Sequence, residues 1–363
     1  MLLNKNLDLA IRHFSPAWYA SVMGTGGLAN VFYELSTRLG WLRVYSQILL
    51  FLNIALFVIL IIPWIIRWFT HFDKVLEDLR HSIMANFFVT MPVGVVVLGT
   101  NLFIIGPKYF SSSFIDHTGI VLWIFGCLSI MYFGIAAAFN LFRADKVSHE
   151  VTNFAWLISP VASIVIPLLG DFVAKNYIPS NIPLARTVNL VDIIFYGTGF
   201  MLFILFSSVV LQRFVSHPMP ESVAAPTFWI MLGPVGGGVV SLMGLASISK
   251  AVGLLSSVSS LNILAIIFWG FGLWAFLFVL AISFWYLLKG KIPFSLSWWA
   301  FIFPLAIYAI SSYSVYLYTK VDAIYWYTIV LVVLLSLLWL VAFINSIIGI
   351  YTKKLLIPKK SNS

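Results

Sequence analysis

The amino-acid sequence predicts an all-α polytopic membrane protein, in which ten transmembrane helices form five helical hairpins. Three observations lead to this prediction. Of the 363 residues, 61% are hydrophobic and 9% are charged, whereas about a quarter of the residues in a soluble domain are charged. Apolar stretches of about 20 residues, the length that crosses a bilayer, recur from end to end. A short signature of aromatic and helix-breaking residues returns in every second stretch.

The ten predicted spans follow one another with short loops of at most about 16 residues. Their boundaries are 14–33, 45–67, 82–104, 118–142, 153–170, 187–212, 226–247, 260–288, 296–318 and 323–351. Loops of this length leave no room for a soluble domain. Residues 1–363 are therefore predicted to form a single transmembrane domain with short tails at 1–13 and 352–363.

The repeated signature consists of aromatic residues, a glycine or proline four to six residues later, and a small residue two positions further. The five copies are Trp18 and Tyr19 with Gly24 and Gly26, Phe87 and Phe88 with Pro92 and Gly94, Phe154 and Trp156 with Pro160 and Ala162, Phe228 and Trp229 with Pro234 and Gly236, and Trp298 and Trp299 with Pro304 and Ala306. The breakers lie 68, 68, 74 and 70 residues apart, a period typical of repeated units. Interrupted backbone at membrane depth is tolerated only against protein or a water-filled cavity, so the breakers predict a pore or carrier.

These residues also have plain structural interpretations. The aromatic pairs are equally compatible with an interfacial belt and with packing against a kink. The glycine-rich segments, one containing Gly24, Thr25 and Gly26 and the other beginning at Gly236, either permit close helix packing or expose backbone to a permeating ion.

Charged residues are absent from the five odd-numbered predicted spans, and Asp192 is the one acidic residue placed inside any span. This pattern argues against a proton pump based on carboxylates and against a cation channel with an acidic ring. Hydroxyls, amides and the N-terminal ends of interrupted helices favour weak binding of an anion instead. Asp192 is interpreted as paired with a neighbouring helix or protonated, with a titrating role as the alternative.

The remaining composition excludes other classes. Cys127 is the single cysteine, so no disulfide forms within the chain. No metal site, cofactor site or catalytic motif is expected, and the protein is not predicted to be an enzyme.

The side with both termini carries 14 Lys and Arg residues and the other side 7, so the termini are predicted to be cytoplasmic. The net charge of +9 is attributed to contact with lipid headgroups rather than to nucleic-acid binding. Five histidines are expected on the cytoplasmic side: His13, His71, His81, His149 and His217.

One position breaks the symmetry of the repeat. The residues before the five breakers are Met23, Met91, Ser159, Gly233 and Phe303. If all five point toward a shared axis, the single aromatic ring of Phe303 can close a narrow pore, because a hydrophobic constriction excludes water. Ordinary core packing is the competing interpretation.

Two segments resemble a known family. Residues 14–29 (FSPAWYASVMGTGGLA) and 297–304 (SWWAFIFP) are similar to the first and ninth helices of the tellurite-resistance/dicarboxylate transporter family, which includes TehA, fungal malic-acid and sulfite transporters and plant slow anion channels. The resemblance implies a pseudo-five-fold ring of hairpins around a central pore, lined by the odd-numbered spans. It also implies a homotrimer with one pore per protomer, and a gating phenylalanine at Phe303, with Phe301 as the nearest rival.

The leading hypothesis is a transporter or channel for small anions in the cell membrane, with C4-dicarboxylates such as malate as the favoured substrate. The pathway would pass Gly24, Thr25, Gly26 and the four prolines with their following small residues. A sulfite exporter, or a passive chloride or nitrate channel, is the alternative with the same fold. A non-conducting membrane scaffold is a third hypothesis.

Overall fold

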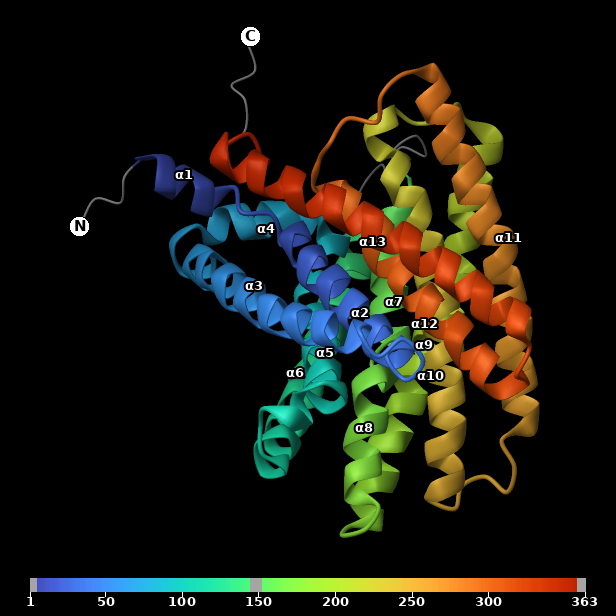
Figure 1. Ribbon diagram of the computed structural model, residues 1–363. Coiled ribbons are helices and arrows are strands. Elements are labelled where there is room, and N and C mark those ends of the chain that lie inside the picture. The colour runs from blue at the N-terminus through green and yellow to red at the C-terminus, as the bar shows by residue number, and fades with distance from the viewer. Residues whose placement is uncertain (1–4, 144–151, 358–363) are drawn as a thin grey trace.

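The computed structural model describes residues 5–143 and 152–357, and every element within these ranges is a helix (Figure 1). Five long helices alternate along the chain with five shorter helical segments. The long ones are called the outer helices: α3 (Leu42–Thr70), α6 (Ser112–Arg143), α9 (Ile182–Ser216), α11 (Ser259–Lys289) and α13 (Asp322–Tyr351). His149, which the sequence places on the cytoplasmic side, lies outside the described residues.

The shorter segments, called the inner segments, each begin with a 3₁₀ turn. They are η1 (Pro16–Trp18) with α2 (Tyr19–Leu35), η2 (Met84–Phe87) with α5 (Thr90–Ile104), η5 (Phe154–Leu157) with α7 (Ile158–Ile164) and α8 (Pro167–Tyr177), η6 (Ser222–Met231) with α10 (Leu232–Ala251), and η7 (Leu296–Phe301) with α12 (Ile302–Thr319). Short helices α1 (Lys5–Arg12) and α4 (Phe72–Arg80) and the turn η3 (Gly106–Lys108) complete the described elements.

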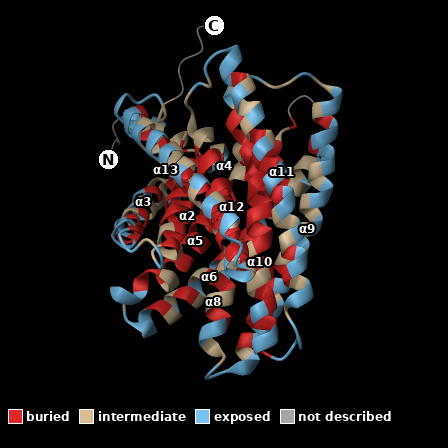
Figure 2. Ribbon diagram, turned by 45° about the vertical axis from the view of Figure 1, so that its right-hand side comes forward, coloured by how far each residue is buried: buried red, intermediate tan, exposed pale blue. Residues whose placement is uncertain are grey.

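Burial separates the two sets of helices. In the most apolar stretch of each outer helix, 17–33% of the residues are buried, whereas the share is 78–83% in the four inner segments long and apolar enough for the same comparison. Figure 2 shows the buried residues gathered in the middle of the bundle and the exposed ones on the surrounding helices. The outer helices therefore present apolar surface outward, as expected in lipid, and the inner segments contact protein.

The inner segments contact one another in a closed order. Helix α2 packs on α5, α5 on α8, α8 on α10, α10 on α12, and α12 packs back on α2. Each outer helix packs on the inner segment that precedes it in the chain: α3 on α2, α6 on α5, α9 on α7 and α8, α11 on α10, and α13 on α12. The contacts between inner segments thus run from each one to the next and from the last back to the first.

Nine helices in the described part of the chain are long and apolar enough to cross a membrane, where the sequence predicts ten. The predicted span 14–33 corresponds to η1 and α2 and is not among the nine. Three glycines, Thr25 and Asn30 make α2 less apolar than the other spans. Because most of α2 is buried against neighbouring helices, it needs no apolar lipid-facing surface.

The sequence analysis assumed that the prolines interrupt the inner segments in their middle. In the structure they do not. Each of Pro92, Pro160, Pro234 and Pro304 is the third residue of an α-helix that follows a 3₁₀ turn. In the first turn of a helix the missing proline N–H leaves no hydrogen bond unmade. The prolines therefore mark where the 3₁₀ turn gives way to the α-helix, and the aromatic residues lie around that junction.

The fifth predicted span, 153–170, ends too early. The chain turns at 165–166 and continues as α8 to Tyr177. Pro167 begins this helix in the position where proline is favoured. The extension brings Asp171 and Lys175 into an inner segment, although the sequence analysis placed both outside the spans.

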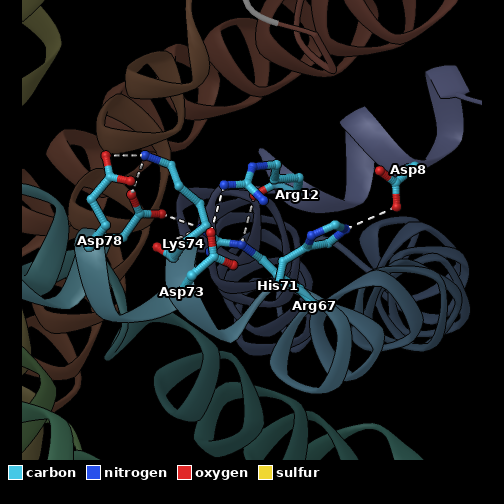
Figure 3. A network of polar contacts seen from close by, with 8 residues as sticks. Asp8, Arg12, Arg67, His71, Asp73, Lys74 and Asp78 are labelled. Carbon is cyan, nitrogen blue, oxygen red and sulfur yellow. Dashed lines mark hydrogen bonds and ion pairs between the residues drawn. The ribbon is translucent and has the colours of Figure 1, made fainter.

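Ion pairs fasten the N-terminal helix to the end of the first hairpin (Figure 3). Arg12 of α1 binds Asp73 of α4 at 2.6 Å, and His71 lies 3.1 Å from Asp8. The buried Arg67 of α3 pairs with Asp78 and donates to the Arg12 carbonyl oxygen at 3.1 Å. The N-terminal segment also meets the C-terminal one, since His13 and Ile357 line a common cavity of about 410 Å³.

Candidate functional site

Two cavities lie inside the bundle, and every inner segment contributes to both of them. The first, called the wide cavity, has a volume of about 300 Å³ and lies among the C-terminal halves of the inner segments. Its polar lining consists of Asn30, Glu34, Thr100, Asp171, Lys175, Ser247 and Ser314. The wide cavity therefore combines hydroxyl and amide groups with two carboxyl groups and one ammonium group.

The second, called the narrow cavity, has a volume of about 50 Å³ and lies among the N-terminal parts of the same segments. Its lining is mainly apolar and aromatic, with Phe87 and Trp299 among its walls and Thr90, Thr227 and Ser297 as polar members. None of the described residues lining the narrow cavity is charged. A volume of this size holds only a few water molecules.

Phe303 lines both cavities. Its side chain is 4% exposed, and its ring lies 3.8 Å from the position that a Cβ atom would occupy on Gly27 of α2. A Cβ atom on Gly233 of α10 would lie 3.9 Å from the Cβ atom of Pro304, the next residue after Phe303. Phe303 thus borders both cavities, with Gly27 of α2 beside its ring.

Phe301 has a different environment. Its ring packs edge-on against Trp229 at 5.2 Å and against Trp298 at 5.4 Å between centroids. Within the described residues, Phe301 lines neither cavity. Of the two phenylalanines that the sequence left open, Phe303 is the one between the cavities, and Phe301 belongs to an aromatic cluster.

The five residues before the breakers do not all share one interior, as the sequence analysis supposed. Met23 and Gly233 line the narrow cavity together with Phe303. Met91 lines a separate surface cavity with Trp64 and Phe125, and Ser159 donates to the Asn86 side chain at 2.9 Å. The inner segments are therefore rotated differently from copy to copy.

The small residues of the signature lie at helix contacts. A Cβ atom on Gly236 would lie 2.6 Å from the Tyr308 backbone nitrogen, so α10 and α12 touch through their backbones. Gly24 faces Ile302 at 2.9 Å and Gly26 faces Val97 at 2.5 Å, measured in the same way, whereas Gly94 has ordinary contacts with α2. Ala162 and Ala306 are fully buried, and the Thr25 hydroxyl accepts a hydrogen bond from Trp339 at 3.0 Å. Of the lining residues predicted from the signature, Pro304 lines the narrow cavity. Within the described chain, the others line neither cavity.

Many inner hydroxyls and amides bind other helices. Thr90 donates to the Pro16 carbonyl oxygen at 2.7 Å, and Ser241 donates to the Ile164 carbonyl oxygen at 2.8 Å. Asn101 donates to Asn30 at 2.6 Å and accepts from Asn53 at 2.9 Å. These contacts make the polar groups part of helix packing.

Glu34, Asp171 and Lys175 are the site residues that sequence reasoning missed. The expectation of charge-free inner segments is wrong, because α2 extends to Leu35 and α8 to Tyr177, beyond the predicted ends. One signal was available: Pro167 in the sequence can begin a new helix, and the residues that follow it continue as one.

Asp192 lies on outer helix α9 behind the wide cavity. It is completely buried, and its Oδ1 accepts a hydrogen bond from the Trp123 indole of α6 at 2.9 Å. A Cβ atom on Gly170 would lie 1.9 Å from Asp192 Oδ2, so the carboxyl group sits directly against α8. The structure thus pairs Asp192 with a neighbouring helix.

The described part of the chain is all-helical and has nine candidate spans, and its buried inner segments line two adjoining cavities, an organisation typical of a membrane transport protein. A family model described as a voltage-dependent anion channel matches residues 13–347, and the chain belongs to this family, called SLAC1.

The relatives whose names state a function are less similar to this chain than an archaeal transporter whose function is not stated. An uncharacterized transporter of Methanocaldococcus jannaschii is 35% identical over 95% of this chain and 96% of its own. A sulfite efflux pump of Arthroderma benhamiae is 29% identical over 83% of this chain and 81% of its own. A malic acid transport protein of Schizosaccharomyces pombe is 22% identical over 82% of this chain and 69% of its own.

Proposed function

We propose that this protein conducts small anions across the cell membrane along the interior of its five inner segments, arranged as a pseudo-five-fold ring. The observation that carries the proposal is the pair of cavities in series, each lined by all five segments and meeting at Phe303. Membership of an anion channel family supports the choice of anions as the cargo.

Phe303 is proposed as the gate of this pathway. Its ring separates a small apolar cavity from a larger polar one, and an apolar constriction prevents conduction by excluding water. The ring lies beside Gly27, whose lack of a side chain leaves it next to the α2 backbone. Rotation of one side chain would then connect the two cavities.

Both termini are proposed to be cytoplasmic, so that the narrow cavity opens toward the cytoplasm. The excess of Lys and Arg on the side of the termini supports this orientation. The N- and C-terminal segments also line one cavity, as expected of a chain that crosses the membrane an even number of times. The homotrimer remains a prediction, to be tested by the mass of the detergent-solubilised protein.

Small singly charged inorganic anions, hydrogen sulfite among them, are proposed as the preferred cargo. The narrow cavity has room for only a few water molecules, and the carboxyl groups of the wide cavity disfavour multiply charged ligands. The sulfite efflux pump among the relatives agrees with this choice. Malate is the second candidate, because the wide cavity is larger and one relative is a malic acid transport protein.

The proposal is tested by anion flux into proteoliposomes that contain the purified protein. Chloride, sulfite and malate are compared as single substrates and as competitors, with and without a pH gradient. We expect chloride and sulfite to move down their own gradients and to compete with each other. Absence of flux for all three anions, in both wild type and a Phe303→Ala variant, would support the non-conducting scaffold instead.

A further inference from the structure

We infer that Asp171 controls which anions cross the wide cavity: its ionised carboxylate opposes anions in proportion to their charge, and protonation removes this barrier. The inference rests on the proposed anion pathway and adds a charge filter that depends on pH. Asp171 is thereby a specificity-determining residue, which acts by its charge and not by binding the anion.

The position of Asp171 gives it influence over the whole cavity. It lies on α8 at the wall of the wide cavity, whose volume of about 300 Å³ leaves no route far from its lining. Glu34 of α2 is a second carboxyl group in the same wall. Because the Coulomb energy is proportional to the product of the charges, a doubly charged anion is opposed twice as strongly as a singly charged one.

Glycines in the surrounding helices make space for the carboxyl group. A Cβ atom on Gly244 of α10 would lie 1.9 Å from Asp171 Oδ2. One residue earlier on α8, Gly170 makes the same allowance for Asp192. Larger residues at these two glycines would displace the carboxyl groups.

The described residues provide no counter-ion that cancels the charge of Asp171. Its Oδ1 atom is buried without a hydrogen-bond partner in the described structure, as is Oδ2 of Asp192. No ion pair within residues 5–143 and 152–357 involves Asp171. An ionised Asp171 therefore has no ion-pair partner among the described residues, and Lys175 is the basic residue that shares the described cavity wall with it.

Titratable and charged groups lie on α8 and on most of the helices around it. Helix α9 contributes Asp192, which interacts electrostatically with Asp171. The other titratable or charged residues on α8 and on the helices packed against it are Lys175 and Tyr177 on α8, Lys250 on α10, Asp116, His117, Cys127, Tyr132 and Arg143 on α6, and Arg186, Tyr196 and Arg213 on α9. Across the cavity, α2 carries Tyr19, Tyr33 and Glu34, and α12 carries Tyr308, Tyr313, Tyr316 and Tyr318. Helix α5 carries no titratable residue. Of these groups, Glu34, Asp171 and Lys175 line the wide cavity.

The test compares chloride with sulfate, because neither ion changes its charge between about pH 5 and about pH 8, the range in which an aspartate in a protein can titrate. Fluxes are measured in proteoliposomes with equal pH on both sides. The variants are Asp171→Asn, Glu34→Gln and, as matched control, Asp116→Asn, which removes the same charge from the end of α6 outside both cavities.

In the wild type we expect the ratio of sulfate flux to chloride flux to rise as the pH falls, because protonation removes negative charge from the cavity. Asp171→Asn should raise this ratio at about pH 8 by about threefold or more and flatten its pH dependence. Glu34→Gln should act in the same direction, and Asp116→Asn should match the wild type.

A ratio that is independent of pH in the wild type would overturn the inference, even if Asp171→Asn fails to fold. So would a folded Asp171→Asn variant with the wild-type ratio and pH profile. Failure of the proposed function looks different: neither anion then crosses, in the wild type or in Phe303→Ala, at any pH.

Discussion

The narrow and wide cavities are built by the same five inner segments, yet they differ in size and chemistry. The narrow cavity, at the 3₁₀ turns and first α-helical residues, is small and lined without charge. The wide cavity, near the C-terminal ends of the helices, is larger and contains Glu34, Asp171 and Lys175. Phe303 marks the boundary between them.

The difference has its origin in the two kinds of helix end. At the N-terminal ends, bulky aromatic residues and prolines pack the segments together and fill the interior. At the other ends the helices extend past the apolar stretch, and acidic and basic side chains reach the cavity. On the proposed pathway, passage would be limited by size and dehydration on one side of Phe303 and by charge on the other.

The largest effect is expected from filling the narrow cavity. Gly233 lines this cavity, and a Cβ atom there meets its neighbours at 3.4 Å or more, so a side chain can be accommodated without backbone movement. Gly233→Leu should reduce anion flux by about tenfold or more, which corresponds to a rise of about 1.4 kcal/mol in the barrier.

The matched control is Gly134→Leu on outer helix α6, where no atom lies within 4 Å of the new Cβ. Flux per folded protein is compared, with the fraction of folded protein taken from gel filtration. If Gly233→Leu conducts like the wild type, the narrow cavity is not part of the pathway.

A smaller effect is expected from the one basic residue of the wide cavity. Lys175→Gln should lower chloride flux about threefold, because a positive charge at the mouth raises the local anion concentration. Raising the salt concentration should diminish the difference, since salt screens exposed charges. Lys108→Gln, on η3 and outside both cavities, is the control and should leave the flux unchanged. A salt-independent loss of flux in Lys175→Gln would indicate a packing defect instead.

The smallest effect on flux is expected outside both cavities, in the ion-pair network of Figure 3. Arg67→Met leaves Asp78 without its buried partner and should destabilise the fold by about 3 kcal/mol, seen as a lower unfolding temperature. Arg12→Met, which breaks the exposed pair with Asp73, should change the unfolding temperature little. Flux per folded protein should stay at the wild-type level in both variants. A change of flux in folded Arg67→Met would extend the pathway to the N-terminal helix.

Much of the fold could be predicted from the sequence, because long apolar stretches have few alternatives in a membrane. The predicted spans 45–67, 118–142 and 323–351 each lie within an observed helix. The recurring signature lies near the start of each inner segment, although it was interpreted as a break at membrane depth. The role of the prolines was misjudged, because sequence spacing does not distinguish a proline in a first turn from one that breaks a helix.

The candidate site was predicted less completely. Phe303 was found because it is the one aromatic residue before a breaker, and this is a local property of the sequence. Glu34 and Asp171 were missed because hydropathy ends a span at the first charge, whereas a helix buried in protein continues past it. The rotation of each inner segment depends on packing between distant helices, such as Gly236 against Tyr308, which no single segment encodes.

The most direct test of the central claim compares anion flux through Phe303→Ala with flux through Phe301→Ala. Both residues are phenylalanines with 4% exposure, two positions apart, but Phe303 alone of the two lines the cavities within the described chain. We predict that Phe303→Ala raises chloride flux about tenfold or more, whereas Phe301→Ala leaves flux per folded protein near the wild-type value. Equal flux in the two folded variants, or a rise in Phe301→Ala alone, would contradict a gate at the junction of the two cavities.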